Sequence, residues 1–226
     1  MRSFLFVSGL LLWGACAPTP YKDLRQVAPT EHTGLSDRAL SYKPSFDKAL
    51  YECVVEGKTP LGKKYRLSGL LFLKQFEDGT DRVVFQSQMG NTFFDFGWDY
   101  EDQFTVHRII AQMDKPALIA TLRKDFELLL FKNLPEQASG FYTDGNYHYL
   151  RFELSKGFVY YLFQNQQMRG IENADEKRKV VVMQLNGTAS EAPSLASHIH
   201  IAHLRAGFTI RLTKLENENS NDATTE

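Results

Sequence analysis

Residues 63–98 read KKYRLSGLLFLKQFEDGTDRVVFQSQMGNTFFDFGW and decide the fold class. In the first part of this stretch apolar or small residues recur at every second position, and one face carries Tyr65, Leu67, Gly69, Leu71 and Leu73. A period of two residues is that of a β-strand with one buried face. The pattern stops at Glu77-Asp78-Gly79-Thr80, whose Asp-Gly pair is a hairpin turn signal, and resumes afterwards. The stretch therefore predicts antiparallel strands joined by tight turns.

The same alternation continues on both sides of this stretch. Strands are predicted over residues 48–57, 63–76, 82–89, 92–98, 104–110, 147–154, 157–164, 166–171, 179–186, 197–204 and 208–215. One helix is predicted over residues 116–131, where apolar residues fall three and four apart and Pro116 suits the first turn after an Asp114 cap. The predicted fold class is α+β, mostly β: a curled antiparallel half-barrel sheet of about eleven strands with the helix packed on its concave face.

The bulk composition excludes several classes of protein. The 226 residues are 43% hydrophobic and 23% charged, which is too apolar for a disordered chain and too charged for a polytopic membrane protein. The formal net charge of -1 supplies no basic field for phosphate binding, so no nucleic acid partner is expected. Two cysteines, Cys16 and Cys53, are too few for a disulfide framework or a four-thiolate zinc site.

The first residues have the pattern of an export signal. Met1-Arg2-Ser3 is a basic start, residues 4–13 are a largely apolar run, and Gly14-Ala15-Cys16 follows. A transmembrane helix needs roughly 20 apolar residues, so this run is too short to be a permanent span. The segment resembles the signal peptide of bacterial lipoproteins, in which the cysteine after the cut is acylated, although Trp13 stands where those signals prefer Leu. The alternative is a plain signal peptide that happens to contain a cysteine.

The resemblance implies that Cys16 carries acyl chains, which makes membrane lipids a partner of the mature protein. Ala17 stands in place of the Asp that retains lipoproteins at the inner membrane, so the expected location is the periplasmic face of the bacterial outer membrane. The predicted organisation is a signal peptide over 1–15, a lipidated cysteine and flexible tether over 16–44, one half-barrel domain over 45–215 and a disordered tail over 216–226.

The order of the predicted elements resembles that of the LolA and LolB lipoprotein carriers. The resemblance lies in Gly69-Leu70-Leu71-Phe72-Leu73-Lys74, in residues 82–85 and 90–95, in the helix at 118–131 and in the closing strands at 199–201 and 209–212. It implies an incomplete barrel whose helix covers an apolar cavity, and a role in binding acyl chains and transferring lipoproteins or lipids to the outer membrane. Lipoproteins or a periplasmic carrier are the implied partners. A membrane-contact loop with an exposed Leu is also implied, and Leu61, which lies between lysines, is the candidate. The alternative is an ordinary hairpin tip with one Leu, since the family's loop lies later among the strands.

Six apolar residues are predicted to line the cavity and contact the acyl chain: Leu71, Phe85, Phe94, Phe96, Leu122 and Phe126. The alternative is an interior filled by its own side chains, in a docking or structural envelope lipoprotein of the same fold. A cavity on the order of several hundred Å³ favours the carrier, and a packed interior favours the alternative.

No motif indicates catalysis, so the protein is expected not to be an enzyme and to need no cofactor. The sequence has no nucleophile elbow, phosphate loop or dinucleotide fingerprint. His198, His200 and His203 could contribute to a zinc site, but no Cys or carboxylate lies in the same stretch, and a solvated polar face without metal is predicted. Solvated carboxylates are likewise expected at Asp95, Asp99, Glu101 and Asp102.

Overall fold

The computed structural model of the protein describes residues 20–28, 36–59, 61–187 and 194–215. The predicted signal peptide over 1–15, the predicted acylation site Cys16 and the predicted tail over 216–226 lie outside the described residues. They stay predictions.

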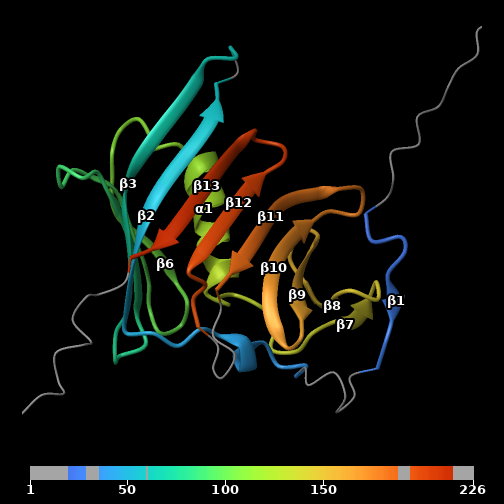
Figure 1. Ribbon diagram of the computed structural model, residues 1–226. Coiled ribbons are helices and arrows are strands. Elements are labelled where there is room, and N and C mark those ends of the chain that lie inside the picture. The colour runs from blue at the N-terminus through green and yellow to red at the C-terminus, as the bar shows by residue number, and fades with distance from the viewer. Residues whose placement is uncertain (1–19, 29–35, 60, 188–193, 216–226) are drawn as a thin grey trace, which may run out of the picture.

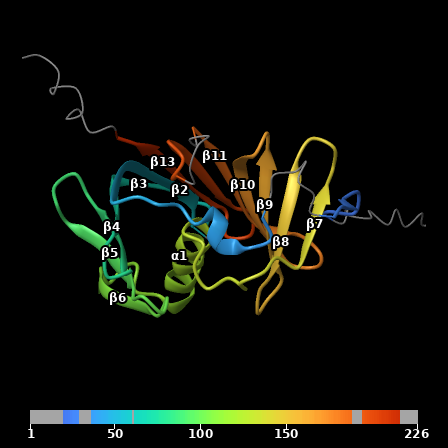
Figure 2. The same ribbon diagram turned by 90° about the horizontal axis from the view of Figure 1, so that it is seen from below.

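Thirteen strands form one antiparallel sheet (Figure 1). They are β1 (Arg25–Gln26), β2 (Lys48–Lys58), β3 (Lys64–Gln75), β4 (Asp81–Gln86), β5 (Thr92–Trp98), β6 (Phe104–Ile109), β7 (Gly140–Thr143), β8 (His148–Glu153), β9 (Phe158–Gln164), β10 (Gln167–Ala174), β11 (Lys179–Asn186), β12 (His198–His203) and β13 (Phe208–Lys214). Their order in the sheet is β1-β7-β8-β9-β10-β11-β12-β13-β2-β3-β4-β5-β6. β1 and β6 are therefore the two edges of a sheet that curls without closing, as the view from below shows (Figure 2).

Two helices accompany the sheet: the short 3-10 helix η1 (Ala39–Tyr42) and the longer α1 (Pro116–Leu129). α1 lies inside the curl (Figure 2), where the ring of its Phe126 is 5.9 Å from that of Phe94 on β5. The Tyr161 hydroxyl of β9 donates to the carbonyl oxygen of Leu128 at 2.8 Å, so α1 touches two distant parts of the sheet. The predicted fold class, a mostly β curled sheet with a helix on its concave face, is confirmed.

The strand count differs from the prediction because β1 and β7 were not foreseen. β1 contains two residues and β7 four, which is too short for an alternating pattern to be recognised. The two strands pair with each other, Arg25 opposite Thr143 and Gln26 opposite Tyr142. β1 therefore depends on a partner more than 100 residues away, which local sequence does not indicate, whereas β7 also pairs with the nearby β8.

Alternation determines the buried face of β2, β3 and β4, as predicted, whereas β9 is buried at five consecutive positions. On β2 and β3, Tyr51, Cys53, Leu71 and Leu73 are at most 2% exposed, and the residues between them are more exposed. β4 ends earlier than predicted, at Gln86. The chain turns there through Gly90, at a left-handed φ of 82°, and the turn leaves Met89 exposed.

Part of the segment predicted as a flexible tether over 16–44 packs on the domain. The Tyr21 hydroxyl donates to the Glu172 carboxylate at 2.7 Å, and the Tyr21 ring lies 4.2 Å from that of Tyr160. Farther along, Ala39 of η1 is buried, and its N–H donates to the carbonyl oxygen of Glu136. Tyr21 packs there because the outer face of β8–β10 carries a tyrosine-rich cluster whose apolar surface Tyr21 removes from water, whereas Ala39 belongs to the main core.

Candidate functional site

A cavity of about 530 Å³ lies between the concave face of the sheet and the N-terminal part of α1. β2 and β3 contribute Cys53, Val55, Leu67 and Leu71 to its wall, and β4 and β5 contribute Phe85, Phe93 and Phe94. α1 contributes Leu118, Leu122 and Phe126 from the opposite side. A site of this size and apolar character suits an apolar ligand, since small-molecule sites commonly enclose roughly 300–1,000 Å³.

Five of the six residues predicted to line a cavity lie at its wall: Leu71, Phe85, Phe94, Leu122 and Phe126. The exception is Phe96, which is fully buried behind the wall, where its ring stacks on Phe94 with centroids 4.4 Å apart. Phe96 therefore supports the wall and does not line the cavity. Whether these residues contact an acyl chain stays a prediction.

One part of the wall was missed by sequence reasoning. β13 contributes Phe208, Ile210 and Leu212 to the cavity. These residues alternate along β13, so the signal was present, but its use requires knowing that β13 pairs with β2. That pairing joins the first and last parts of the domain in sequence, so no local sequence pattern indicates it.

The mouth of the cavity is polar and positively charged. Its polar lining includes Lys58, Arg66 and Lys115, and none of the described residues lining the cavity carries a carboxylate. Arg66 forms an ion pair with Glu56, and Arg211 contacts the same carboxylate at 2.8 Å, so one negative charge faces two guanidinium groups. Hydrogen bonds from these two guanidinium groups lower the pKa of Glu56.

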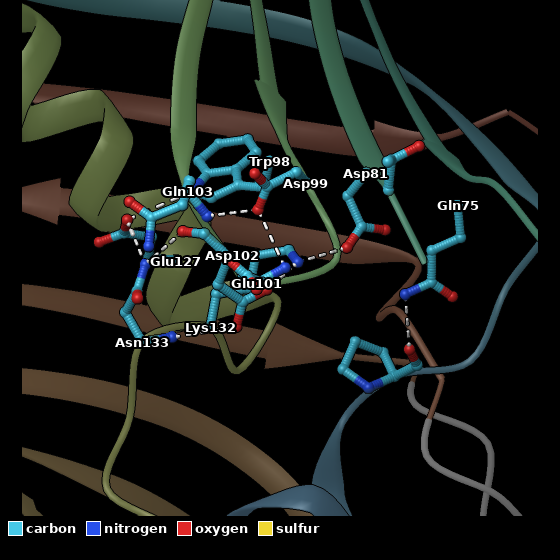
Figure 3. Close-up of polar contacts among 12 residues, drawn as sticks. Gln75, Asp81, Trp98, Asp99, Glu101, Asp102, Gln103, Glu127, Lys132 and Asn133 are labelled. Atoms are coloured by element: carbon cyan, nitrogen blue, oxygen red, sulfur yellow. Dashed lines mark hydrogen bonds and ion pairs between the residues drawn. The ribbon is translucent and has the colours of Figure 1, made fainter. Parts of the chain in front are cut away.

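A polar network lies where α1 ends, among residues that do not line the cavity (Figure 3). Lys132, fully buried, places its ammonium group 2.6 Å from Asp81 and 2.5 Å from Asp102. The indole N–H of Trp98 donates to Glu127 of α1 at 3.3 Å, which ties the helix to β5. A buried lysine between two carboxylates meets the requirement that buried charge be paired.

The carboxylates predicted to be merely solvated are therefore partly structural. Asp102 forms an ion pair with Lys132. Asp95 accepts two hydrogen bonds from the Arg82 guanidinium, both of 2.7 Å. The Asp99 carboxylate accepts hydrogen bonds from the backbone N–H groups of Glu101 and Gln103, and these bonds fix the turn between β5 and β6. The prediction was wrong for Asp95 and Asp102 because their cationic partners come from other elements.

The predicted solvated histidine face is also wrong at His203. Its imidazole is buried, stacks on Phe208 at 4.0 Å, and places Nε2 2.9 Å from a carboxylate oxygen of Asp125 on α1. Burial raises the pKa of Asp125, and the contact with His203 opposes this rise. Across the described part of the chain, no group of three or more His, Cys, Asp or Glu side chains is placed to hold a metal ion.

Two further residues of interest lie at or near the cavity. Leu61, the membrane-contact candidate, is 97% exposed in the turn between β2 and β3, next to the mouth. Cys53 lines the wall as a thiol, and burial raises its pKa to about 12. Within the described residues, no helix combines the length and apolar character that crossing a bilayer requires.

Comparison with known proteins gives a likeness in structure only. No family model and no curated protein matches the chain. Among solved structures, a LolA superfamily protein from Nitrosomonas europaea matches with a TM-score of 0.51 at 10% identity, over 84% of this chain and 93% of that one. A putative outer membrane lipoprotein-sorting protein domain from Vibrio parahaemolyticus matches with a TM-score of 0.45 at 6% identity, over 79% and 87%. The likeness to the Nitrosomonas europaea protein shows that the two chains share a fold.

Proposed function

We propose that this chain, which has the LolA-superfamily fold, is an outer-membrane-anchored carrier that holds acyl chains in its cavity and takes part in transferring lipoproteins or lipids to the outer membrane. The observation that carries the proposal is the cavity beneath α1, with its apolar wall and polar mouth. The proposed role is binding and transfer and requires no catalytic step. Its partners are lipoproteins or lipids, together with a periplasmic carrier that delivers them.

The energetics suit reversible binding. Burying about ten CH₂ groups at roughly 0.8 kcal/mol each contributes about 8 kcal/mol before the entropy cost of association. The wall needs no hydrogen bond to an acyl chain, and aromatic side chains such as Phe85 and Phe94 accommodate a chain of irregular shape. A carrier must release its cargo, and an apolar cavity of this kind allows release.

The alternative is a docking or structural lipoprotein with a filled interior. Packing under β8–β10 supports this alternative locally, since Tyr161 and Phe163 are buried there without facing the cavity. The cavity of about 530 Å³ under β2–β5 favours the carrier, because a filled interior would leave no space of that size.

Membrane attachment belongs to the proposal in two parts. Cys16 is proposed as the acylated residue that holds the protein at the periplasmic face of the outer membrane. Leu61 is proposed to dip into the bilayer, and its exposed position beside Lys63 and Lys64 supports this role. Cys16→Ala should move the protein from the membrane fraction to the soluble fraction, and unchanged fractionation contradicts the anchor.

Acyl-chain binding is tested with a charge placed in the wall. Soluble Cys16→Ala protein is titrated with a neutral fluorescent apolar probe, and monoolein is used to displace it. Leu118→Asp, at a half-buried wall position of α1, should weaken binding by about tenfold or more, because the carboxylate must be desolvated beside the ligand. Ala120→Asp, on the exposed side of the same helix, is the matched control and should bind like the parent protein. Absence of binding by the folded parent protein refutes the carrier.

A further inference from the structure

Positive charge at the cavity mouth is left without a counter-charge. Lys58, at the end of β2, and Lys115, directly before α1, both line the cavity. Neither makes an ion pair with any residue that the structure describes. Arg66, the third cation of the lining, is already paired with Glu56. The two lysines are therefore the lining cations that make no ion pair, while Arg66 shares the single Glu56 carboxylate with Arg211.

The ladder between β2 and β3 shows the same imbalance. At the mouth Lys58 lies directly opposite Lys64, and like charges in this position repel each other. At the other end of the two strands Lys48 lies opposite Lys74, but there Asp47 forms an ion pair with Lys74. At the end of β2 and β3 that carries Lys48 and Lys74, a carboxylate of the chain thus balances part of the positive charge. The mouth has no such carboxylate among the residues lining the cavity.

The start of α1 adds to the positive potential. Its N-cap is Lys115, not Asp114 as predicted, and it makes no side-chain capping hydrogen bond. The first turn contains no acidic residue, and the exposed Asp114, directly before Lys115, does not line the cavity. A helix N-terminus carries a partial positive charge that Asp or Glu in the first turn usually balances. Leu118, in this first part of the helix, lines the cavity. The helix end, Lys115 and the Lys58–Lys64 pair thus contribute charge of one sign around one opening.

We propose that the ligand of the cavity is an amphiphile whose headgroup is anionic, with its acyl chain against the apolar wall and its carboxylate or phosphate at the mouth near Lys58 and Lys115. This inference rests on the proposed function, acyl-chain binding, and adds the charge of the headgroup. A neutral headgroup leaves the lysines unpaired, whereas an anionic one gains charge-assisted contacts with them.

The test compares headgroups on one acyl chain. Monomeric oleate, oleoyl lysophosphatidylglycerol and monoolein, each below its aggregation concentration and without vesicles, displace a neutral probe from soluble Cys16→Ala protein. The two anionic ligands should bind about fivefold to tenfold tighter than monoolein, the range expected for two exposed ion pairs. Comparing oleate with the lysophospholipid tells whether a carboxylate or a phosphate is preferred. High salt should bring the ratio of anionic to neutral affinity toward one.

Lysine variants locate the effect. The double variant Lys58→Gln, Lys115→Gln should lower the ratio of anionic to neutral affinity toward one. The variant Lys48→Gln, Lys177→Gln removes the same charge from exposed positions that do not line the cavity, and should keep the ratio. Equal affinities for all three ligands overturn the inference and leave acyl-chain binding intact. Binding of none of them overturns both. A ratio that survives in the mouth variant, or is lost in the control, also overturns the inference.

Discussion

The concave face of the sheet divides into a hollow half and a filled half. In the hollow half, formed by β2–β5 and the N-terminal part of α1, Phe85 and Phe94 line a cavity of about 530 Å³. In the filled half, formed by β8–β10, the ring of Tyr161 stacks on that of Phe131 at 4.2 Å. The ring of Phe163 lies 4.8 Å from that of Tyr42. No residue of β7–β11 lines the cavity.

The difference arises from the segments that connect the elements. Tyr42 belongs to η1, and Phe131 follows the end of α1 with a left-handed φ of 54°. A bulky residue in this region costs roughly 1–2 kcal/mol, and here the strain places the Phe131 ring in the filled half. Aromatic residues on the strands thus belong to the core where a connecting segment places a ring against them. They line the cavity where no connecting segment does so.

The largest effect is expected from emptying the filled half. Tyr161→Ala removes a fully buried ring and the hydrogen bond to Leu128, and should lower the free energy of unfolding by about 4 kcal/mol in urea denaturation. Leu118→Ala in the hollow half should lose less than half of this, because the side chain already borders empty space. Equal losses contradict the division into two halves.

The next effect concerns the contact that joins α1 to β12. His203→Ala leaves the Asp125 carboxylate buried without its partner and should cost about 3 kcal/mol near neutral pH. Because burial raises the pKa of Asp125, the folded protein binds its proton more readily than the unfolded chain does. Without His203 the pKa of Asp125 rises further, so the loss should be smallest at acid pH, where Asp125 is protonated in both proteins. It should grow once pH passes the pKa of Asp125 in the parent protein, which lies above the ordinary value of about 4. Replacing Asp125 and His203 together by Leu should recover most of the stability, and failure to do so assigns the loss to packing.

A smaller effect is expected from converting the hollow half into a filled one. Val55→Phe places a ring at the cavity wall and should raise the free energy of unfolding by about 1 kcal/mol, as cavity-filling changes commonly do. The same variant should lose probe and monoolein binding. Retained binding together with raised stability would show that the ligand lies elsewhere.

The last experiment measures the reactivity of a cavity-wall residue and involves no change in stability. Cys53 is the single thiol of the Cys16→Ala protein, and burial raises its pKa to about 12. At pH 8 the folded protein should therefore resist alkylation, and its rate should climb with pH through pH 10 without a plateau. The urea-unfolded protein is the control and should react readily. Rapid reaction of the folded form contradicts a closed wall at this position.

The strands and the helix could be predicted because their signals are local. Alternation from Tyr65 to Leu73 and helical spacing from Leu118 to Leu129 depend only on neighbouring residues. Leu71, Leu122 and Phe126 of the wall followed from those two patterns, and Phe85 and Phe94 followed from the same alternation on β4 and β5. The ionic contacts did not, because Lys132 and His203 find their carboxylates on other elements. The sequence also could not distinguish residues of the cavity wall from residues of the core, since both lie on apolar strand faces. Only the rings that the connecting segments place against a strand distinguish them.

The docking of the segment that contains Tyr21 and β1 limits the length of free chain between an acylated Cys16 and the domain. Tyr21 binds Glu172 of β10, and ladder pairs lead from there across β11, β12 and β13 to Glu56, at the mouth end of β2. With acyl chains on Cys16, an extended chain reaches Pro20 within roughly 14 Å, whereas a free tether through residue 44 would span roughly 100 Å. Under the proposed function, a domain held so closely, with its opening at the anchored end, would not travel to collect cargo. A mobile partner would then have to deliver the cargo, and transfer would take place at one fixed height above the bilayer.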